Sequence, residues 1–328
     1  MALPRGKRKP LSPALGAQWA QLAHVLYLQA LMSETNWTCK QIAFQGGTSL
    51  HLSWGSPRHS EDLDFLLSKE IQAEAIQAVS KRVALALKEQ FTRIDPRFEV
   101  ELRPKTKDAS RMVVDQIVIS HPGYIGNAMA KAEFWRVEDS YLADYPVALR
   151  TPRAPGRPDD LVGVISSPVP AATLATAYAD KLTAFATRPN LKWRDVFDLW
   201  WIGTQAKGDD VDPASPAIIK QFLHNVTAYA TRDDLPPADA LRLFLQLDRN
   251  EVIAKADPDL RRWLPDKLWD QLHRMGGIED MVDYVRMALA TVADGIDGGR
   301  RDKDRDVGRL DEADDAGEAD SDTNPPRG

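Results

Sequence analysis

The sequence predicts an α+β protein in which a domain with a mixed sheet is followed by an all-helical C-terminal domain. Up to about residue 140, apolar stretches that suit strands alternate with helical stretches. From Ala171 onward the strand patterns disappear, and amphipathic stretches punctuated by proline replace them. The 328 residues, of which 43% are hydrophobic and 27% charged, are enough for two soluble globular domains.

The net charge of −6 lies entirely in the last part of the chain. Residues 294–328 hold twelve acidic and six basic side chains, whereas residues 1–293 hold 36 of each. A neutral body does not indicate a nucleic-acid-binding protein, although it leaves room for a local basic groove. Because the composition after residue 293 has no periodicity, we expect 294–328 to be a disordered acidic tail.

The N-terminal residues and the single cysteine indicate the cellular compartment of the protein. Cys39 can form no intramolecular disulfide and no thiolate cluster for zinc, which fits a reducing cytoplasm. We expect residues 1–12 to be a flexible basic arm and 13–35 to be an amphipathic helix, because glutamines and a histidine interrupt its apolar face. No window of about 18 apolar residues predicts a membrane span, so we expect a cytoplasmic protein without membrane contact.

Hydrophobic periodicity places the elements of the two expected domains, 13–168 and 169–293. In the first domain we expect strands that alternate apolar and polar residues, together with helices that carry one apolar face. Residues 141–168, rich in proline and glycine, predict a connector with one or two short strands. The expected strands are 42–44, 62–67, 98–102, 112–119 and 131–137, and the expected helices are 13–35, 48–54, 70–90, 171–187, 193–206, 214–230, 237–248 and 265–292.

A glycine pair, Gly46-Gly47, directly follows the first apolar strand. The pair predicts a tight turn, and Thr48 after it suits the N-cap of the next helix. Such a turn presents free backbone N–H groups and a helix N-terminus to an anion, most simply a phosphate. A lone glycine pair is usually only a turn.

Two carboxylates, Asp62 and Asp64, begin the second expected strand. Because strand side chains alternate faces, both point the same way while Leu63 and Phe65 point into the core. Adjacent carboxylates on an apolar strand repel each other and resist burial. A hard divalent cation such as Mg2+ resolves that conflict and prefers such oxygen ligands. A lone Asp-x-Asp is usually a solvated strand edge, but after a glycine turn it becomes much more specific.

A second group of charged residues lies on two expected helices of the C-terminal domain. Lys181 and Arg188 are two helical turns apart and share a face, and so do Asp195 and Asp198, which are three residues apart. Taken alone, this pattern favours a solvated helical hairpin. In the other interpretation the two cations clamp a triphosphate.

Taken together, these stretches resemble the AbiEii/AbiGii-type nucleotidyltransferase toxins of bacterial abortive-infection and toxin–antitoxin systems. The order matches over roughly residues 40–205 and rests on Gly46-Gly47-Thr48-Ser49-Leu50, on residues 58–65, and on residues 181–199. The resemblance implies a polymerase-β-like nucleotidyltransferase domain followed by a helical domain. Thirteen residues separate Thr48 from Asp62, slightly more than is usual in the superfamily, so the active-site loop is expected to be longer here.

The resemblance also implies roles for individual residues. Mg2+, or Mn2+ in its place, is expected at Asp62 and Asp64, and Asp195 matches the late acidic position of the family. Glu133 is the candidate for a third carboxylate, Asp115 competes with it, and either could be an ordinary outward-facing acid of a strand. The residues expected to contact the nucleotide are Gly46, Gly47, Thr48, Arg58, Ser60, Lys181 and Arg188.

The function implied is transfer of a nucleotide from a nucleoside triphosphate to an acceptor hydroxyl, with release of pyrophosphate. RNA is the expected acceptor, in particular the 3′ end of tRNA, and the expected outcome is toxicity in phage defence, restrained by an antitoxin. The basic arm could contact RNA phosphates or simply aid solubility. Alternatives are nucleotidylation of a protein or of a small molecule such as an aminoglycoside. Another is a non-catalytic nucleotide-binding regulator, although the intact acidic pair argues against that.

Overall fold

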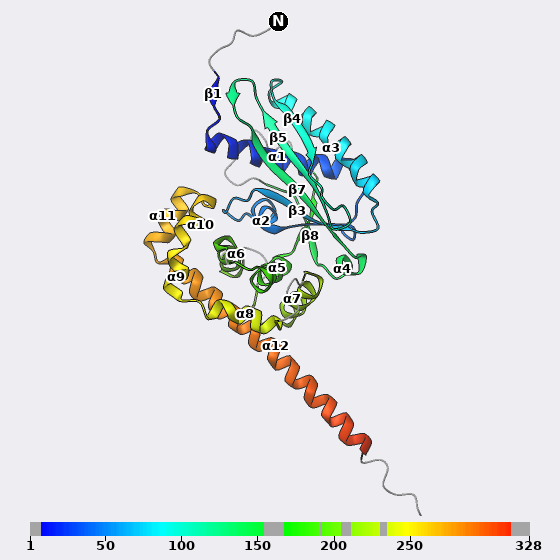
Figure 1. Cartoon of the computed structure of the whole chain (residues 1–328), viewed down its shortest axis with the longest axis vertical. Coiled ribbons are helices and arrows are strands. Elements are labelled where there is room, and N and C mark those ends of the chain that lie inside the picture. The colour runs from blue at the N-terminus through cyan, green and yellow to red at the C-terminus, as the bar shows by residue number, and fades with distance from the viewer. Residues whose placement is uncertain (1–7, 154–166, 191, 205–210, 230–234, 316–328) are drawn as a thin grey trace, which may run out of the picture.

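The computed structural model describes residues 8–153, 167–190, 192–204, 211–229 and 235–315. A mixed sheet and two long helices form one half of the molecule, and a group of helices forms the other (Figure 1). The expected α+β class, with a mixed sheet followed by a helical region, is confirmed.

The central sheet has seven strands in the order β4-β5-β7-β3-β2-β9-β8. The β3–β7 and β2–β9 pairs are parallel, and the other neighbours are antiparallel. The strands are β2 (Ile42–Gln45), β3 (Asp62–Ser68), β4 (Glu99–Pro104), β5 (Met112–Ser120), β7 (Ala128–Val137), β8 (Val147–Arg150) and β9 (Val169–Ala172).

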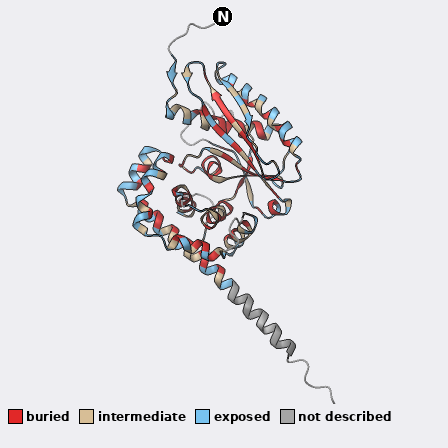
Figure 2. Ribbon diagram, viewed as in Figure 1, coloured by how far each residue is buried: buried red, intermediate tan, exposed pale blue. Residues whose placement is uncertain are grey.

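Two long helices, α1 (Pro13–Glu34) and α3 (Ala73–Ile94), pack on each other and on one face of the sheet (Figure 1). The core on this face contains aromatic rings from three neighbouring strands. Phe65 lies 4.8 Å from Phe134 and 5.2 Å from Phe44, measured between ring centroids. Figure 2 shows buried positions, in red, along the strands of the sheet. Stacked rings of this kind add to the stabilisation that burial of their area provides.

The opposite face of the sheet packs against the helical region. Strand β3 divides its residues between the two faces: Leu63, Phe65 and Leu67 join the core beneath α1 and α3, and Leu66 joins the core of the helices. Because side chains alternate, the carboxylates at the start of β3 share the face of Leu66. The alternation therefore directs Asp62 and Asp64 toward the helical region.

The expected helices 171–187, 193–206, 214–230 and 237–248 are confirmed as α5 to α8, with small shifts at their ends. The expected single helix 265–292 is wrong, because Gly276 in the left-handed region (φ 69°) separates two helices. The helices of this region are α5 (Leu174–Thr187), α6 (Trp193–Thr204), α7 (Pro216–Tyr229), α8 (Pro237–Leu245), α9 (Arg249–Ala254), α10 (Ala256–Leu260), α11 (Asp266–Arg274) and α12 (Gly277–Asp315), with a 3-10 turn at Arg261–Trp263.

Several short elements were not expected from the sequence. In the expected basic arm, β1 (Lys9–Pro10) pairs in parallel with β6 (Tyr124–Ile125). A short helix, α4 (Asp139–Ala143), follows β7, and β9 adds a strand to the sheet where the helical domain was expected to begin.

The chain beyond residue 293 differs from the expected tail. Helix α12 continues to Asp315, so residues 294–315 are helical where disorder was expected. Residues 1–7 of the expected arm and 316–328 of the expected tail lie outside the described residues. In the part of the chain that the structure describes, no helix combines the length and the apolar character that crossing a membrane requires.

Candidate functional site

A cavity of about 320 Å³ opens where the sheet meets α5 and α6. Elements from distant parts of the sequence line it: the β2–α2 turn, the ends of β3 and β7, and helices α5 and α6. Of the eleven residues that the sequence predicts for the site, all but Thr48 line this cavity. They are Gly46, Gly47, Arg58, Ser60, Asp62, Asp64, Glu133, Lys181, Arg188 and Asp195.

Strand pairing brings three acidic side chains to the cavity. In the parallel register of β3 and β7, Asp64 lies opposite Glu133 and Asp62 lies opposite Lys131. The Lys131 Nζ is 3.7 Å from an Asp62 carboxylate oxygen and 3.8 Å from one of Glu133. The other candidate third acid, Asp115, pairs with Ala132 and accepts a 2.6 Å hydrogen bond from Ser80 on α3. Only Glu133 of the two therefore faces the cavity.

The acidic group carries unfavourable charge repulsion. Burial, followed by the charges of Glu133 and Asp62, raises the pKa of Asp64 to about 7. Burial and the charge of Asp62 also raise the pKa of Glu133. Carboxylates held together in this way bind a proton or a cation favourably, and an oxygen-only donor set suits a hard divalent cation.

No three His, Cys, Asp or Glu side chains among the described residues are grouped tightly enough to hold a metal ion by themselves. Mg2+ in phosphate-binding sites commonly takes only one or two carboxylates and completes its shell with water and substrate phosphates. The donor set around Asp62 and Asp64 fits that mode of binding.

The glycine pair permits a close approach between α2 (Gly46–Ser49) and the acidic strand. Gly46 has a φ of +77°, and a Cβ there would collide with the Asp64 carboxylate. A Cβ on Gly47 would collide with the Arg58 guanidinium and lie 2.9 Å from the Ser60 hydroxyl. Any larger residue would displace these side chains from the cavity wall.

Thr48 does not have the capping role that the sequence suggests. Helix α2 already begins at Gly46 and has Gln45 as its N-cap residue, without a side-chain cap. The buried Thr48 hydroxyl instead donates a hydrogen bond to the backbone carbonyl of Asp62. Thr48 therefore joins the turn to the acidic strand and does not line the cavity.

Five side chains form a charge chain along one wall, in the order Arg58, Asp198, Lys181, Asp195, Arg188. The first four are buried, and the side chain of Arg188 is 38% exposed. Two guanidinium nitrogens of Arg58 each donate to Asp198 at 2.7 Å. The Lys181 Nζ lies 2.7 Å from Asp198 and 3.2 Å from Asp195, and Arg188 pairs with the other oxygen of Asp195. The chain therefore joins the loop before β3 to helices α5 and α6 with three cations and two anions.

The charge chain keeps its two acids ionised inside the protein. Burial alone would raise the pKa of both, but Lys181 and Arg188 hold the pKa of Asp195 below its usual value. Arg58 and Lys181 likewise lower the pKa of Asp198. Asp198 is fully buried and Arg58 is only 1% exposed. Three N–H groups of Arg58 donate to Asp198 and to the carbonyl of His59, so Arg58 ties the loop before β3 to α6.

Sequence reasoning missed other residues of this site. Arg194 lies in the matched motif and lines the cavity with its guanidinium 5.9 Å from the centre of the Trp263 ring. Asp180 accepts hydrogen bonds from Tyr145 (2.6 Å) and Asn225 (2.8 Å). The position of Asp180 next to Lys181 could have indicated that it belongs to the site. Its hydrogen-bond partners could not be predicted, because they lie far away in the sequence. Gln45 and Trp135 also line the cavity.

A glycine turn, an acidic strand and a buried lysine around one cavity define a site for polyphosphate chemistry. A family model described as "Nucleotidyl transferase AbiEii toxin, Type IV TA system" matches residues 28–274. The chain belongs to this family and is thus a nucleotidyltransferase toxin of the type IV toxin–antitoxin class.

A solved structure shows the same fold. The chain is similar to MenT4, a nucleotidyltransferase toxin from Mycobacterium tuberculosis H37Rv, with 20% identity and a TM-score of 0.51 over 86% of this chain and 85% of that one. It is also similar to JHP933 from Helicobacter pylori, with 17% identity and a TM-score of 0.48 over 92% of this chain and 99% of that one. A search of curated proteins found no match.

Removing one partner of the Arg58–Asp198 pair should strongly destabilise the protein. Asp198→Leu leaves the buried Arg58 guanidinium without its carboxylate, and Arg58→Met leaves Asp198 paired with Lys181 but one cation short. For each we expect a loss of about 3–5 kcal/mol in the free energy of unfolding. Chemical denaturation of these two single variants and of the double variant Arg58→Met/Asp198→Leu measures the coupling, and the double variant should lose less than the sum. The exposed pair of Arg93 and Glu89 is the control, with a loss of about 0–1 kcal/mol for Arg93→Ala. Additive losses at the buried pair would contradict this interpretation.

Asp180, which is half-buried at the cavity wall, should give a specific pH dependence. Burial raises its pKa from 3.8 to about 6, so the folded protein binds this proton more tightly than the unfolded chain does. The contribution of Asp180 to stability therefore falls as pH rises from about 4 to about 6. Urea denaturation over that range should show Asp180→Asn gaining stability relative to the parent, with no further gain above pH 6. A difference that is independent of pH would disprove the shifted pKa.

Proposed function

We propose that the protein is a Mg2+-dependent nucleotidyltransferase that transfers a nucleotide from a nucleoside triphosphate to a hydroxyl of RNA, with the 3′ end of tRNA as the preferred acceptor. As a toxin it would be restrained by a cognate antitoxin. The observation that carries the proposal is the single cavity in which Asp62, Asp64 and Glu133 face the Gly46-Gly47 turn and Lys181.

Asp62 and Asp64 are the proposed ligands of Mg2+, for which Mn2+ could substitute. Bound there, the ion would neutralise charge on the phosphates and favour ionisation of the attacking hydroxyl. The raised pKa of Asp64 supports this assignment, because a carboxylate destabilised by its neighbours gains most from a cation.

The phosphates of the nucleotide are proposed to lie between the glycine turn and the charge chain. The Gly46-Gly47 backbone and the Ser60 hydroxyl would hydrogen-bond to the outer phosphates. Lys181 and Arg188 would neutralise the charge that develops on the departing pyrophosphate. Since the charge chain carries one more cation than anions, it favours such an anion. Arg58 and Thr48 would act indirectly, through Asp198 and Asp62.

In the proposed reaction, the acceptor oxygen bonds to the α-phosphorus while the bond between that phosphorus and the pyrophosphate oxygen breaks. Glu133, whose pKa is raised by burial and by Asp62, is the proposed acceptor of the hydroxyl proton. Little covalent chemistry falls to the protein, so correct positioning of the two substrates provides much of the rate.

A second hollow supports RNA as the acceptor. It has a volume of about 770 Å³ and shares Trp135, Asp180 and Arg188 with the catalytic cavity. Trp135 is 37% exposed and lies two residues after Glu133 on β7, so both side chains share one face. Lys69 and Arg111 add positive charge to this hollow. An exposed aromatic ring among cations suits a single-stranded nucleic acid better than a small polar acceptor.

Nucleotide transfer is tested by incubating the purified protein with each labelled nucleoside triphosphate, Mg2+, and either total tRNA or cell protein. We expect label in RNA, its loss on chelation of Mg2+, and a fall of about 100- to 1,000-fold in rate for Asp62→Asn. Asp144→Asn, at an exposed acid outside the cavity, should retain the parent rate. Label on protein alone would favour the alternative acceptor, and no label with any acceptor would refute the enzymatic proposal.

The acceptor hollow is tested at Trp135. Loss of a stacked base costs about 1–3 kcal/mol, so Trp135→Ala should raise the KM for RNA about 10-fold or more. Trp135→Phe should retain most of the affinity because it keeps an aromatic face. The KM for the nucleoside triphosphate should remain within about twofold in both variants. Equal RNA kinetics for Trp135→Ala and the parent would exclude this hollow as the RNA site.

A further inference from the structure

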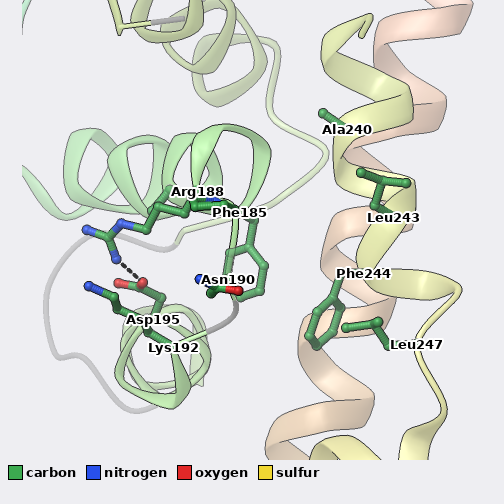
Figure 3. A pocket seen from close by; sticks show the side chains of 11 residues that line it. Phe185, Arg188, Asn190, Lys192, Asp195, Ala240, Leu243, Phe244 and Leu247 are labelled. Carbon is green, nitrogen blue, oxygen red and sulfur yellow. Dashed lines mark hydrogen bonds and ion pairs between the residues drawn. The ribbon is translucent and has the colours of Figure 1, made fainter. Parts of the chain in front are cut away.

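A separate pocket of about 210 Å³ lies between α8 and the chain that connects α5 to α6 (Figure 3). It shares Ala184, Arg188 and Asp195 with the catalytic cavity. The two hollows therefore have a common wall, which contains the ion pair of Arg188 and Asp195. A ligand bound beside this wall could extend from one hollow into the other.

Apolar side chains from two helices form the far walls of this pocket. Phe185 on α5 meets Phe244 on α8 edge to face, with 5.1 Å between ring centroids. Leu243 on α8 and Leu247, two residues after the end of that helix, remain 41% and 43% exposed. Large apolar side chains that gather around a solvent-open pocket are typical of surfaces that a ligand covers.

Polar groups lie at the side of the pocket nearer the catalytic cavity. Asn190 provides an amide with both donor and acceptor groups, and Lys192 provides a cation. Figure 3 shows a single ion pair among the side chains drawn, that of Arg188 and Asp195. Asn190 and Lys192 thus bring an amide and a cation to the wall of the pocket.

We infer that this pocket binds the nucleobase of the nucleoside triphosphate and selects among bases. The inference rests on the proposed function, because it places the triphosphate in the adjacent catalytic cavity. The pocket is smaller than the roughly 300–1,000 Å³ of sites that enclose a drug-sized ligand, so it suits a base and not a whole nucleotide. The apolar walls match the faces of a flat ring, and the Asn190 amide matches its hydrogen-bonding edge.

Calorimetry with non-hydrolysable analogues of the four nucleoside triphosphates, with Mg2+ present, tests the inference. Tripolyphosphate, which has no base, is the comparison ligand. Leu247→Ser should weaken the preferred nucleotide about 5- to 10-fold, and Asn190→Ala should reduce the ratio between the tightest and weakest nucleotides at least about threefold. Both variants should bind tripolyphosphate within about twofold of the parent.

Leu85→Ser is the matched control, because Leu85 is 71% exposed on α3 and far in the fold from this pocket. It should leave every affinity unchanged. Thermal denaturation checks that the variants fold, and Leu243→Ser replaces Leu247→Ser if that variant does not.

Unchanged nucleotide affinities and ratios, as expected if the pocket docks a protein instead, would overturn the inference while leaving nucleotide binding intact. A parent protein that binds neither the analogues nor tripolyphosphate would instead refute the proposed function itself.

Discussion

The charge chain from Arg58 to Arg188 is the constraint on which the rest of the site depends. It joins a loop of the sheet domain to two helices whose residues lie about 140 positions away in sequence. Burying such charges is favourable only when each has well-placed partners, and here the two anions alternate with three cations. The alternation fixes Lys181 across the cavity from the acidic strand. It also holds the Arg58 guanidinium so close to Gly47 that a side chain at position 47 would collide with it.

The acidic strand shows how one element can serve both the core and the site. Apolar residues of β3 enter cores on both faces of the sheet, which holds the strand rigidly. Only the beginning of the strand, at the edge of the helical region, carries Asp62 and Asp64. The strand thus holds Asp62 and Asp64 beside Glu133, with Lys131 between Asp62 and Glu133. An arrangement of this kind is what metal-assisted phosphoryl chemistry requires, since positioning and electrostatics supply most of its rate.

Local patterns predicted much of this structure. Hydrophobic residues that repeat every 2 or every 3.6 positions predicted the long strands and helices. The glycine turn, Asp62 and Asp64 predicted where the site lies. Interactions between distant residues were not accessible: nothing near Asp198 indicates its pairing with Arg58, and nothing near Thr48 indicates its bond to the Asp62 carbonyl. Short elements such as β9 were missed because four residues carry too little pattern and depend on their neighbours in the sheet.

A crystal structure with Mg2+ and a non-hydrolysable nucleoside triphosphate tests the central claim most directly. We expect an ion about 2.0–2.1 Å from oxygens of Asp62 and Asp64. We also expect the outer phosphates against the Gly46-Gly47 backbone, with Lys181 on their far side. A triphosphate bound away from the glycine turn, or an ion held without either aspartate, would contradict the proposed site.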